Sequence, residues 1–240
     1  MSGKQPRRIQ PPDWPARFEE FAGRVRSPML KRFYGQTPVD PDTPLADVPF
    51  VAMDFETSGL DPRSDSIISI GLVPMNLERI RLSGARYWVV KPRREMRDAA
   101  IPIHNITHQE LKNAPDLVTI VEDLLEVLAG TVVVVHYRGI ERRFLDVALH
   151  NRIGEGVVFP MVDTMELEAR VHQPHRRGWV RRLLRRPRPS IRLAESRERY
   201  HLPLYRAHHA LTDALATAEL LQAQVAYRYR PDTPIRKLWC

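Results

Sequence analysis

Two carboxylates stand at the end of a short apolar run. Asp54 and Glu56 follow residues 49–53 and are two positions apart. Side chains at this spacing lie on one face of a strand, so the two acids are expected to be close together. Their repulsion would raise the pKa of each, and a divalent cation such as Mg²⁺ or Mn²⁺ removes that cost. The pair therefore indicates a metal site, against the alternative of two acids on a solvated strand end.

A second candidate group begins the apolar-patterned stretch from His208 to Tyr229, which predicts a helix. A histidine just before a helix and an acid in its second turn can converge on one site, as His208 and Asp213 would. Histidine is well suited to take a proton near neutral pH, so His208 is the candidate general base. For the adjacent His209 we expect only a surface role at the helix start.

A third candidate, Glu141, follows the β-branched run Thr131–Val135 and stands near the start of a predicted helix. Taken alone, this acid would be explained by its favourable interaction with the helix dipole. Glu141 becomes a candidate for the site only when it is considered with the other two groups, because it also lies at the end of a buried strand, as Asp54 does.

The elements that must position these residues are predicted from hydrophobic periodicity and turn residues. The pattern indicates three strands in an antiparallel meander, then helices alternating with two further strands. A leader of residues 1–46 precedes this core and contains one amphipathic helix over Ala16–Tyr34. The core is expected over residues 47–231 and is followed by a tail of residues 232–240. The predicted strands are residues 49–54, 66–73, 84–90, 131–135 and 157–162, and the later helices are residues 140–151, 164–171, 191–200 and 208–229.

The charge of the chain points to a polyanionic partner. The formal net charge is +8, and the segment from His172 to Ser190 holds seven arginines and no acid. We interpret this segment as an insertion that contacts phosphates, with a solvated loop or a protein contact as the alternative. The single cysteine, Cys240, excludes an intrachain disulfide and a thiolate metal site. With no secretory signal and no membrane-spanning run, the sequence predicts a cytoplasmic protein.

Together the motifs resemble those of the DEDDh exonucleases, the DnaQ-like family that includes the proofreading subunit of bacterial replicative DNA polymerase. The resemblance covers roughly residues 48–229. The family's D-x-E-T-x-G-L matches Asp54–Leu60, and its H-x-A-x-x-D-A matches His208–Ala214. Its I-H-x-I-T matches Ile103–Thr107, and a D-T pair after the fifth strand matches Asp163–Thr164.

The family's remaining motif, H-N-x-x-F-D-x-x-F-L, is kept only in part. The register is preserved, but the metal-binding aspartate of the family is replaced by Glu141, which keeps the charge and adds one methylene. This change puts the position and affinity of a second metal in doubt, and Asp146 is a less suitable fallback ligand. The matching residues are His136, Phe144 and Leu145, and the replaced ones are Tyr137, Ile140 and Glu141.

The resemblance implies an RNase H-like α/β fold, with a mixed five-stranded sheet flanked by helices, and a two-metal phosphodiesterase. Two divalent cations, Mg²⁺ or Mn²⁺, would be held by Asp54, Glu56, Glu141 and Asp213. His208 would act as the general base toward the attacking water. The products would be nucleoside 5′-monophosphates.

Substrate contacts follow from the same resemblance. Thr57, Leu60 and Ile106 would contact the 3′-terminal nucleotide, and Arg181 and Arg182 of the insertion would contact phosphates. For Leu60, packing at the strand end is the alternative. The expected ligands are single-stranded or frayed 3′ ends of nucleic acid. Whether a polymerase or a repair protein is a partner is left open.

Three functions remain open at this point. The first is a metal-dependent 3′–5′ exonuclease acting on DNA in proofreading or repair, and the second is an RNA-trimming enzyme of the same chemistry. The third is a nucleic-acid-binding module that lost its metal site through Glu141. Because concentrated negative charge disfavours the binding of a polyanion, the retained acids favour an enzyme over a binding module.

Overall fold

The computed structural model describes residues 11–93, 106–172, 189–206 and 208–240. Five strands form one mixed sheet in the order β3-β2-β1-β4-β5. β2 pairs antiparallel with both β1 and β3, whereas β4 runs parallel to both β1 and β5. The mixed five-stranded sheet, beginning with an antiparallel meander, was predicted from the sequence. The strands are β1 (Phe50–Thr57), β2 (Ile67–Met75), β3 (Arg86–Val89), β4 (Val132–Val135) and β5 (Met161–Asp163).

The central strands are apolar on both faces because helices cover both sides of the sheet. The first four residues of β1 and all four of β4 are buried. Such strands read as continuous apolar runs rather than as alternating patterns. The first polar residue of β1 is Asp54, so the change from apolar to acidic residues falls within the strand, where Phe55 and Glu56 are still buried.

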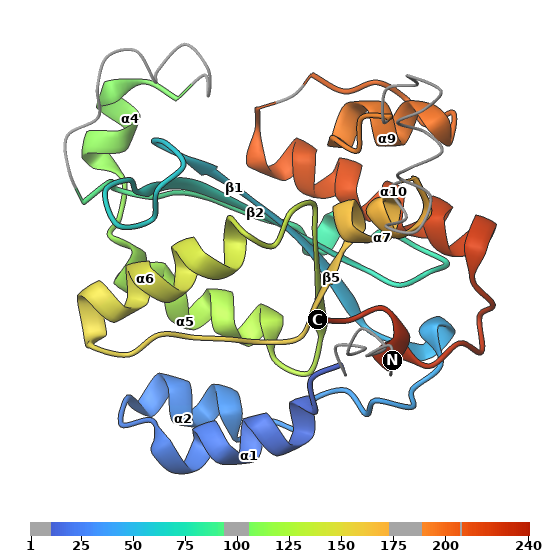
Figure 1. The fold of residues 1–240 in the computed structure, drawn as a ribbon. Coiled ribbons are helices and arrows are strands. Elements are labelled where there is room, and N and C mark those ends of the chain that lie inside the picture. The colour runs from blue at the N-terminus through green and yellow to red at the C-terminus, as the bar shows by residue number, and fades with distance from the viewer. Residues whose placement is uncertain (1–10, 94–105, 173–188, 207) are drawn as a thin grey trace, which may run out of the picture.

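The helices form two layers, which lie on opposite sides of the sheet in Figure 1. One layer holds α5 (Leu117–Leu128) and α6 (Glu141–Ile153), and the other holds α10 (Ala210–Arg228) with α7 (Thr164–His172) and α9 (Leu193–Arg199). α5 illustrates how these helices are specified: the Asp116 side chain accepts the Val118 N–H at 2.9 Å as an N-cap, and six apolar side chains are buried.

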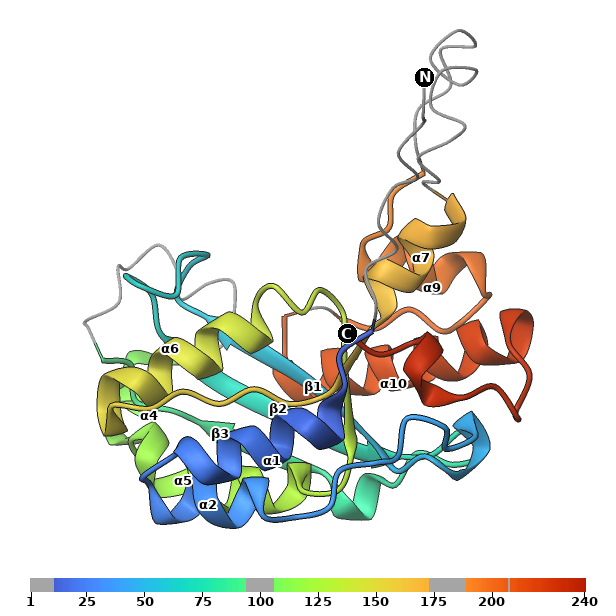
Figure 2. The same cartoon turned by 60° about the horizontal axis from the view of Figure 1, so that its bottom comes forward.

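The leader folds differently from its prediction. In place of one helix over residues 16–34, the structure has α1 (Trp14–Arg24) and α2 (Pro28–Tyr34). Pro28 lacks an N–H and starts the second helix, which explains the break. The Glu155 carboxylate accepts the N–H groups of Arg26 and Ser27, both at 2.7 Å, and so ties this break to the end of α6. Figure 2 shows α1 and α2 beside α5.

A short helix not anticipated from the sequence, α4 (His108–Asn113), follows the family-like segment. A reciprocal capping box between Thr107 and Glu110 starts it. Three short 3₁₀ turns complete the described elements: η1 (Leu45–Asp47), η2 (Leu82–Gly84) and η5 (Ile235–Lys237).

Residues 232–240 pack against the body of the protein. Ile235, Leu238 and Trp239 are buried, and Trp239 forms a bridge to Val162 at the edge of β5. Pro234 forms a bridge to Pro44, so this segment also holds the end of the leader. Among the described residues no helix has the length and apolar character needed to cross a membrane.

Candidate active site

An acidic cluster forms where β1 meets the start of α10. Carboxylate oxygens of Asp54, Glu56 and Asp213 all lie within 4.8 Å of one another. Asp54 and Glu56 are on one face of β1, as their spacing predicted, and Asp213 comes from the first turn of α10. Residues more than 150 positions apart in the sequence thus present three hard oxygen ligands to one point.

A glycine in the middle of β2 allows α10 to come this close. Gly71 pairs with Asp54 across the sheet, and a Cβ at Gly71 would lie 2.4 Å from the backbone carbonyl of Ala210. No side chain fits there unless the helix or the strand moves. The contact is between two backbones, and it sets the distance from Asp213 to the strand that carries Asp54.

Glu141 is the first residue of α6 and is only 2% exposed. Its Oε2 atom has no hydrogen-bond partner among the described residues. Burial raises the pKa of Glu141 well above its usual range, and the charge of Asp163 adds to the effect. A buried carboxylate with a free oxygen is costly unless something positively charged satisfies it.

Glu141 also acts electrostatically on the acidic cluster. Burial raises the pKa of Asp54 well above its usual range, and the charge of Glu141 is the next largest cause, ahead of Asp213 and Glu56. Burial likewise raises the pKa of Asp213, although N–H groups of His208 and His209 partly offset this. Four mutually repelling carboxylates at one end of a sheet fit one or more divalent cations, which would relieve the repulsion.

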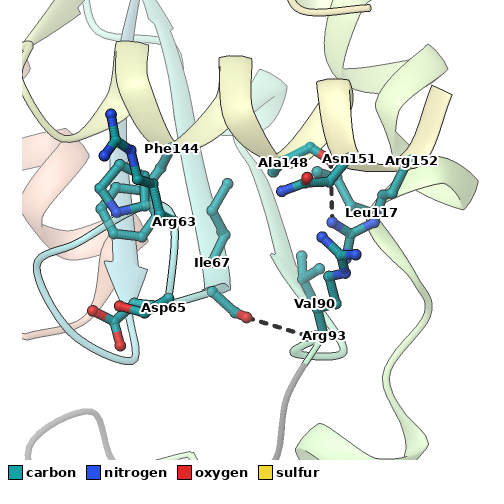
Figure 3. A pocket seen from close by; sticks show the side chains of 13 residues that line it. Arg63, Asp65, Ile67, Val90, Arg93, Leu117, Phe144, Ala148, Asn151 and Arg152 are labelled. Atoms are coloured by element: carbon teal, nitrogen blue, oxygen red, sulfur yellow. Dashed lines mark hydrogen bonds between the residues drawn. The ribbon is translucent and has the colours of Figure 1, made fainter. Parts of the chain in front are cut away.

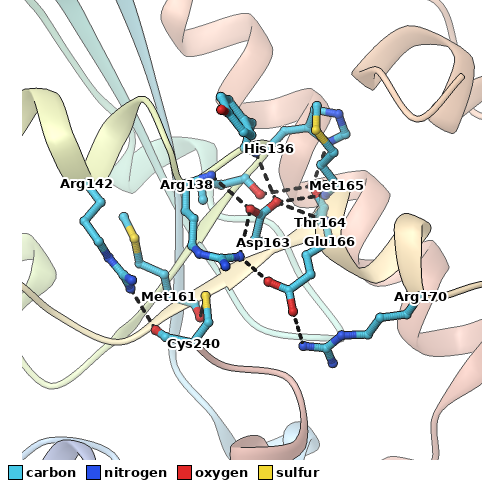
Figure 4. A network of polar contacts seen from close by, with 12 residues as sticks. His136, Arg138, Arg142, Met161, Asp163, Thr164, Met165, Glu166, Arg170 and Cys240 are labelled. Carbon is cyan, nitrogen blue, oxygen red and sulfur yellow. Dashed lines mark hydrogen bonds and ion pairs between the residues drawn. The ribbon is translucent and has the colours of Figure 1, made fainter. Parts of the chain in front are cut away.

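The loop that leads into Glu141 is held by a buried aspartate at the end of β5. Asp163 accepts the backbone N–H groups of Tyr137 and Arg138, each at 3.1 Å, and also pairs with the Arg138 guanidinium. The same carboxylate accepts the N–H groups of Met165 and Glu166 at the start of α7. Figure 4 shows Asp163 at the centre of this network.

Tyr137 adopts a backbone conformation that is unusual for a residue with a side chain. Its φ is +94°, and its ring lies against Gly139, where an added Cβ would be 2.8 Å from Cζ. Such a conformation persists only where surrounding contacts hold it, and here Asp163 does so. The Tyr137 side chain is 51% exposed and lies four residues before Glu141.

The two adjacent histidines have different surroundings, and His209 is not the simple surface residue expected from the sequence. His208 is exposed, has φ +71° and donates its backbone N–H to the Asp213 carboxylate at 2.9 Å. His209 stacks on Tyr87 of β3 with ring centroids 4.8 Å apart. His208 is therefore beside the acidic cluster, whereas the His209 ring is engaged with a neighbouring strand.

The predicted substrate-contacting residues fall into three groups. Leu60 is 83% exposed just beyond the acidic cluster, so the alternative of strand-end packing does not hold, and Thr57 donates its hydroxyl to Gly59 O at 2.7 Å. Ile106 is buried in a small cluster with Ile68 and Leu111. Arg181 and Arg182 lie outside the described residues.

The fallback ligand Asp146 faces away from the acidic cluster. Its carboxylate lies against Gly156 and accepts the N–H of Val157. The supporting roles of Gly71 and Asp163 were not anticipated from the sequence. A glycine inside a predicted strand signals a close backbone approach, and an acid ending the fifth strand repeats the pattern of Asp54.

Comparisons with known proteins identify the family of this chain. The exonuclease family model matches residues 51–221. The chain is 30% identical over 179 residues to the PolC-type DNA polymerase III of Thermotoga maritima, covering 75% of this chain but only 12% of that protein. It is 29% identical over 181 residues to the DNA polymerase III subunit epsilon of Treponema pallidum, covering 75% of this chain and 78% of that one.

Solved structures share the fold at low sequence identity. The nuclease domain of 3′hExo, a DEDDh family member bound to rAMP, superposes with a TM-score of 0.61 at 15% identity, covering 75% of this chain and 92% of that one. Exonuclease X in complex with 5′ overhanging duplex DNA gives a TM-score of 0.56 at 21% identity, covering 77% and 96%. The family match and the DEDDh-like fold lead to one conclusion: this chain belongs to the exonuclease family, and it is a hydrolase.

Proposed function

We propose that the protein is a metal-dependent 3′–5′ exonuclease that removes nucleoside 5′-monophosphates from the 3′ end of DNA. The observation that carries the proposal is the convergence of Asp54, Glu56 and Asp213 within 4.8 Å, beside the buried Glu141, whose charge raises the pKa of Asp54. Both the epsilon relative and Exonuclease X are associated with DNA in their names or titles, which favours DNA as the substrate.

The residues of the site would have different roles in the hydrolysis of one phosphodiester bond. Asp54, Glu56 and Asp213 would hold one divalent cation, and Glu141 together with Asp54 would hold a second. Bound there, the cations would supply Lewis-acid stabilisation of the charge that develops on the phosphate. This assignment gives a role to the free Oε2 of Glu141, which otherwise stays buried without a partner among the described residues.

His208 would take the proton from the attacking water. Its exposed position just before α10, with its backbone N–H donated to the Asp213 carboxylate at 2.9 Å, supports this role beside the acidic cluster. As the P–O3′ bond breaks, the shortened strand leaves with a 3′ hydroxyl. The exposed Leu60 side chain would pack against the terminal base, and Thr57 would contact the same nucleotide.

A second candidate substrate is RNA, because the 3′hExo nuclease domain was solved with rAMP bound. The described residues include no arrangement that we can assign to reading a 2′-hydroxyl. We further propose that the protein works in the cytoplasm, in proofreading or repair, with a polymerase or repair protein as its partner.

The test is hydrolysis of matched DNA and RNA oligonucleotides, each labelled at either the 3′ or the 5′ end. With Mg²⁺ or Mn²⁺, a 3′ label should be released at once as a mononucleotide, whereas a 5′ label should give a ladder. Excess chelator should abolish both signals. Full activity in chelator would disprove the metal mechanism, and binding without hydrolysis under all conditions would favour the non-catalytic module.

A further inference from the structure

A pocket lined by three arginines lies beside the proposed active site and has no role in the mechanism above. Its walls come from the β1–β2 loop, the residues after β3, the start of α5 and the middle of α6. We call it the three-arginine pocket, after Arg63, Arg93 and Arg152, which come from three separate segments of the chain. Figure 3 shows Arg63 on one side of the pocket and Arg93 with Arg152 on the other.

Two of the three guanidinium groups are available to a ligand. Arg152 donates to the Asp116 carboxylate at 2.8 Å and to Ala148 O at 3.2 Å, so one acid already offsets its charge. Neither the Arg63 nor the Arg93 guanidinium has a hydrogen bond or ion pair to any residue in the described part of the chain. Uncompensated guanidinium groups bind phosphate oxygens strongly and often in a bidentate manner.

The one carboxylate lining the pocket is used elsewhere. Asp65 accepts the Asp61 N–H at 2.9 Å and lies 3.5 Å from the Ser58 hydroxyl, so its oxygens are engaged within its own loop. In Figure 3 this carboxylate points away from α6, whereas the Arg63 side chain reaches toward α6. The Asp65 charge remains, but the three arginines outnumber Asp65 and Asp116, so the pocket keeps a positive character.

The floor of the pocket is apolar and rigid. Ile67, Val90, Leu117 and Phe144 line it and are all buried in the core. A low-dielectric floor strengthens the attraction between an arginine and an anion above it. The Ser66 hydroxyl, which accepts the Arg93 N–H at 3.2 Å and keeps its own proton, is a further donor in the lining.

The location of the pocket indicates which anion it would bind. Ile67 pairs with Thr57, the residue after Glu56, and Phe144 lies one helical turn beyond Glu141. Ala148 is about 10 Å along the helix axis from Glu141, a span that a few nucleotides can cover. We propose that the three-arginine pocket binds a backbone phosphate of the nucleic acid, several nucleotides from the scissile bond.

This inference rests on the proposed function, and a binding experiment separates the two. The variant R63Q/R93Q removes both unpaired guanidinium groups from exposed positions. The matched control is R79Q/R81Q, which removes equal charge from the exposed β2–β3 connection at the opposite end of β1. Kd is measured by fluorescence anisotropy in chelator for labelled DNA strands of two to ten nucleotides, and for a duplex with a recessed 3′ end.

For R63Q/R93Q we expect Kd to rise about tenfold on strands that reach the pocket, the size expected for the loss of a charged hydrogen bond. The slope of log K against log salt should become shallower by about 0.7 for each single-strand phosphate that the variant no longer binds. Dinucleotide affinity, and its rate of hydrolysis with Mg²⁺, should not change. A loss confined to the duplex would assign the phosphate to the complementary strand.

An unchanged Kd on every ligand would overturn the inference, as would an equal loss in R79Q/R81Q, which would reveal only a general charge effect. If the wild-type protein binds DNA through the pocket but hydrolyses none, the proposed function fails while the phosphate site stands. If R63Q/R93Q hydrolyses dinucleotides normally but binds long strands weakly, both stand.

Discussion

The four acids of the site are held in two different ways. Asp54, Glu56 and Asp213 form a cluster fixed by strand pairing and by the backbone contact of Gly71 with Ala210. Glu141 instead stands at the end of a loop whose shape depends on hydrogen bonds to Asp163. One proposed cation site is thus built by the sheet and the helix packed against it, whereas the second depends on a separate loop. The sequence departs from the family in that loop.

Removing the charge of Glu141 should have the strongest effect. Activity of Glu141→Gln should fall below about 1% of wild type, because a neutral amide is a weak ligand for a hard cation. Glu141→Asp should retain much more activity and can alter the preference between Mg²⁺ and Mn²⁺. The turnover of both variants is measured with Mg²⁺ and with Mn²⁺.

Melting temperature provides the control for this pair. If Glu141 only favoured the helix dipole, Glu141→Gln would cost about 0.3–1 kcal/mol of stability and leave turnover intact. We expect the opposite, because Glu141 is buried and its Oε2 lacks a partner among the described residues. Glu141→Gln should be inactive, and without metal its melting temperature should be at least as high as that of the wild type. An active, less stable Gln variant would remove Glu141 from the site.

His208→Ala should lower kcat by about 10²-fold with little change in DNA affinity, because a general base acts on the chemical step. His209→Ala is the neighbouring control, and it should affect stability slightly because its stacking on Tyr87 is removed. Steady-state kinetics and anisotropy on both variants test this. If His209→Ala lowered kcat and His208→Ala did not, the general base would be His209 and our assignment would be wrong.

Gly71→Ala tests how the first cation site is built without altering any ligand. The added methyl group must displace α10 or β2 by roughly 1 Å, and a misplacement of that size can cost up to about 10² in rate. Gly23→Ala is the control, because a Cβ there meets nothing within 4 Å. Normal turnover in a folded Gly71→Ala protein would show that the cluster tolerates wider spacing.

The weakest effect should come from changing the arginine-rich segment. Replacing residues 173–188 with a short Gly-Ser linker keeps His172, whose Nε2 lies 3.3 Å from the Glu168 carboxylate, and Ser190, whose carbonyl accepts from Arg199. Binding to single strands should weaken, and the salt slope should become shallower by about 0.7 for each phosphate that is no longer bound. An unchanged slope would mean that this segment does not contact the substrate.

Much of the fold could be predicted because its strands are short, apolar and ended by turn residues. The five strands and the convergence of Asp54 with Asp213 follow from periodicity combined with family motifs. The break at Pro28 was missed because the apolar spacing continues across it, although proline itself is a breaking signal. The network around Asp163 could not be predicted, because it joins backbone N–H groups of a loop whose conformation, with φ +94° at Tyr137, no local pattern specifies.

The missing side chain at Gly71 would have a consequence for which ions the proposed metal site accepts. Mg²⁺ requires oxygen ligands at about 2.0–2.1 Å, whereas Ca²⁺ takes them at about 2.3–2.6 Å in a looser shell. Since two backbones in contact cannot approach further and nothing flexible separates them, the carboxylates of β1 and α10 are held at a nearly fixed span. In the proposed metal site this strand–helix contact would favour the smaller ion, and widening it by one methyl group, as in Gly71→Ala, would shift the preference toward the larger ion.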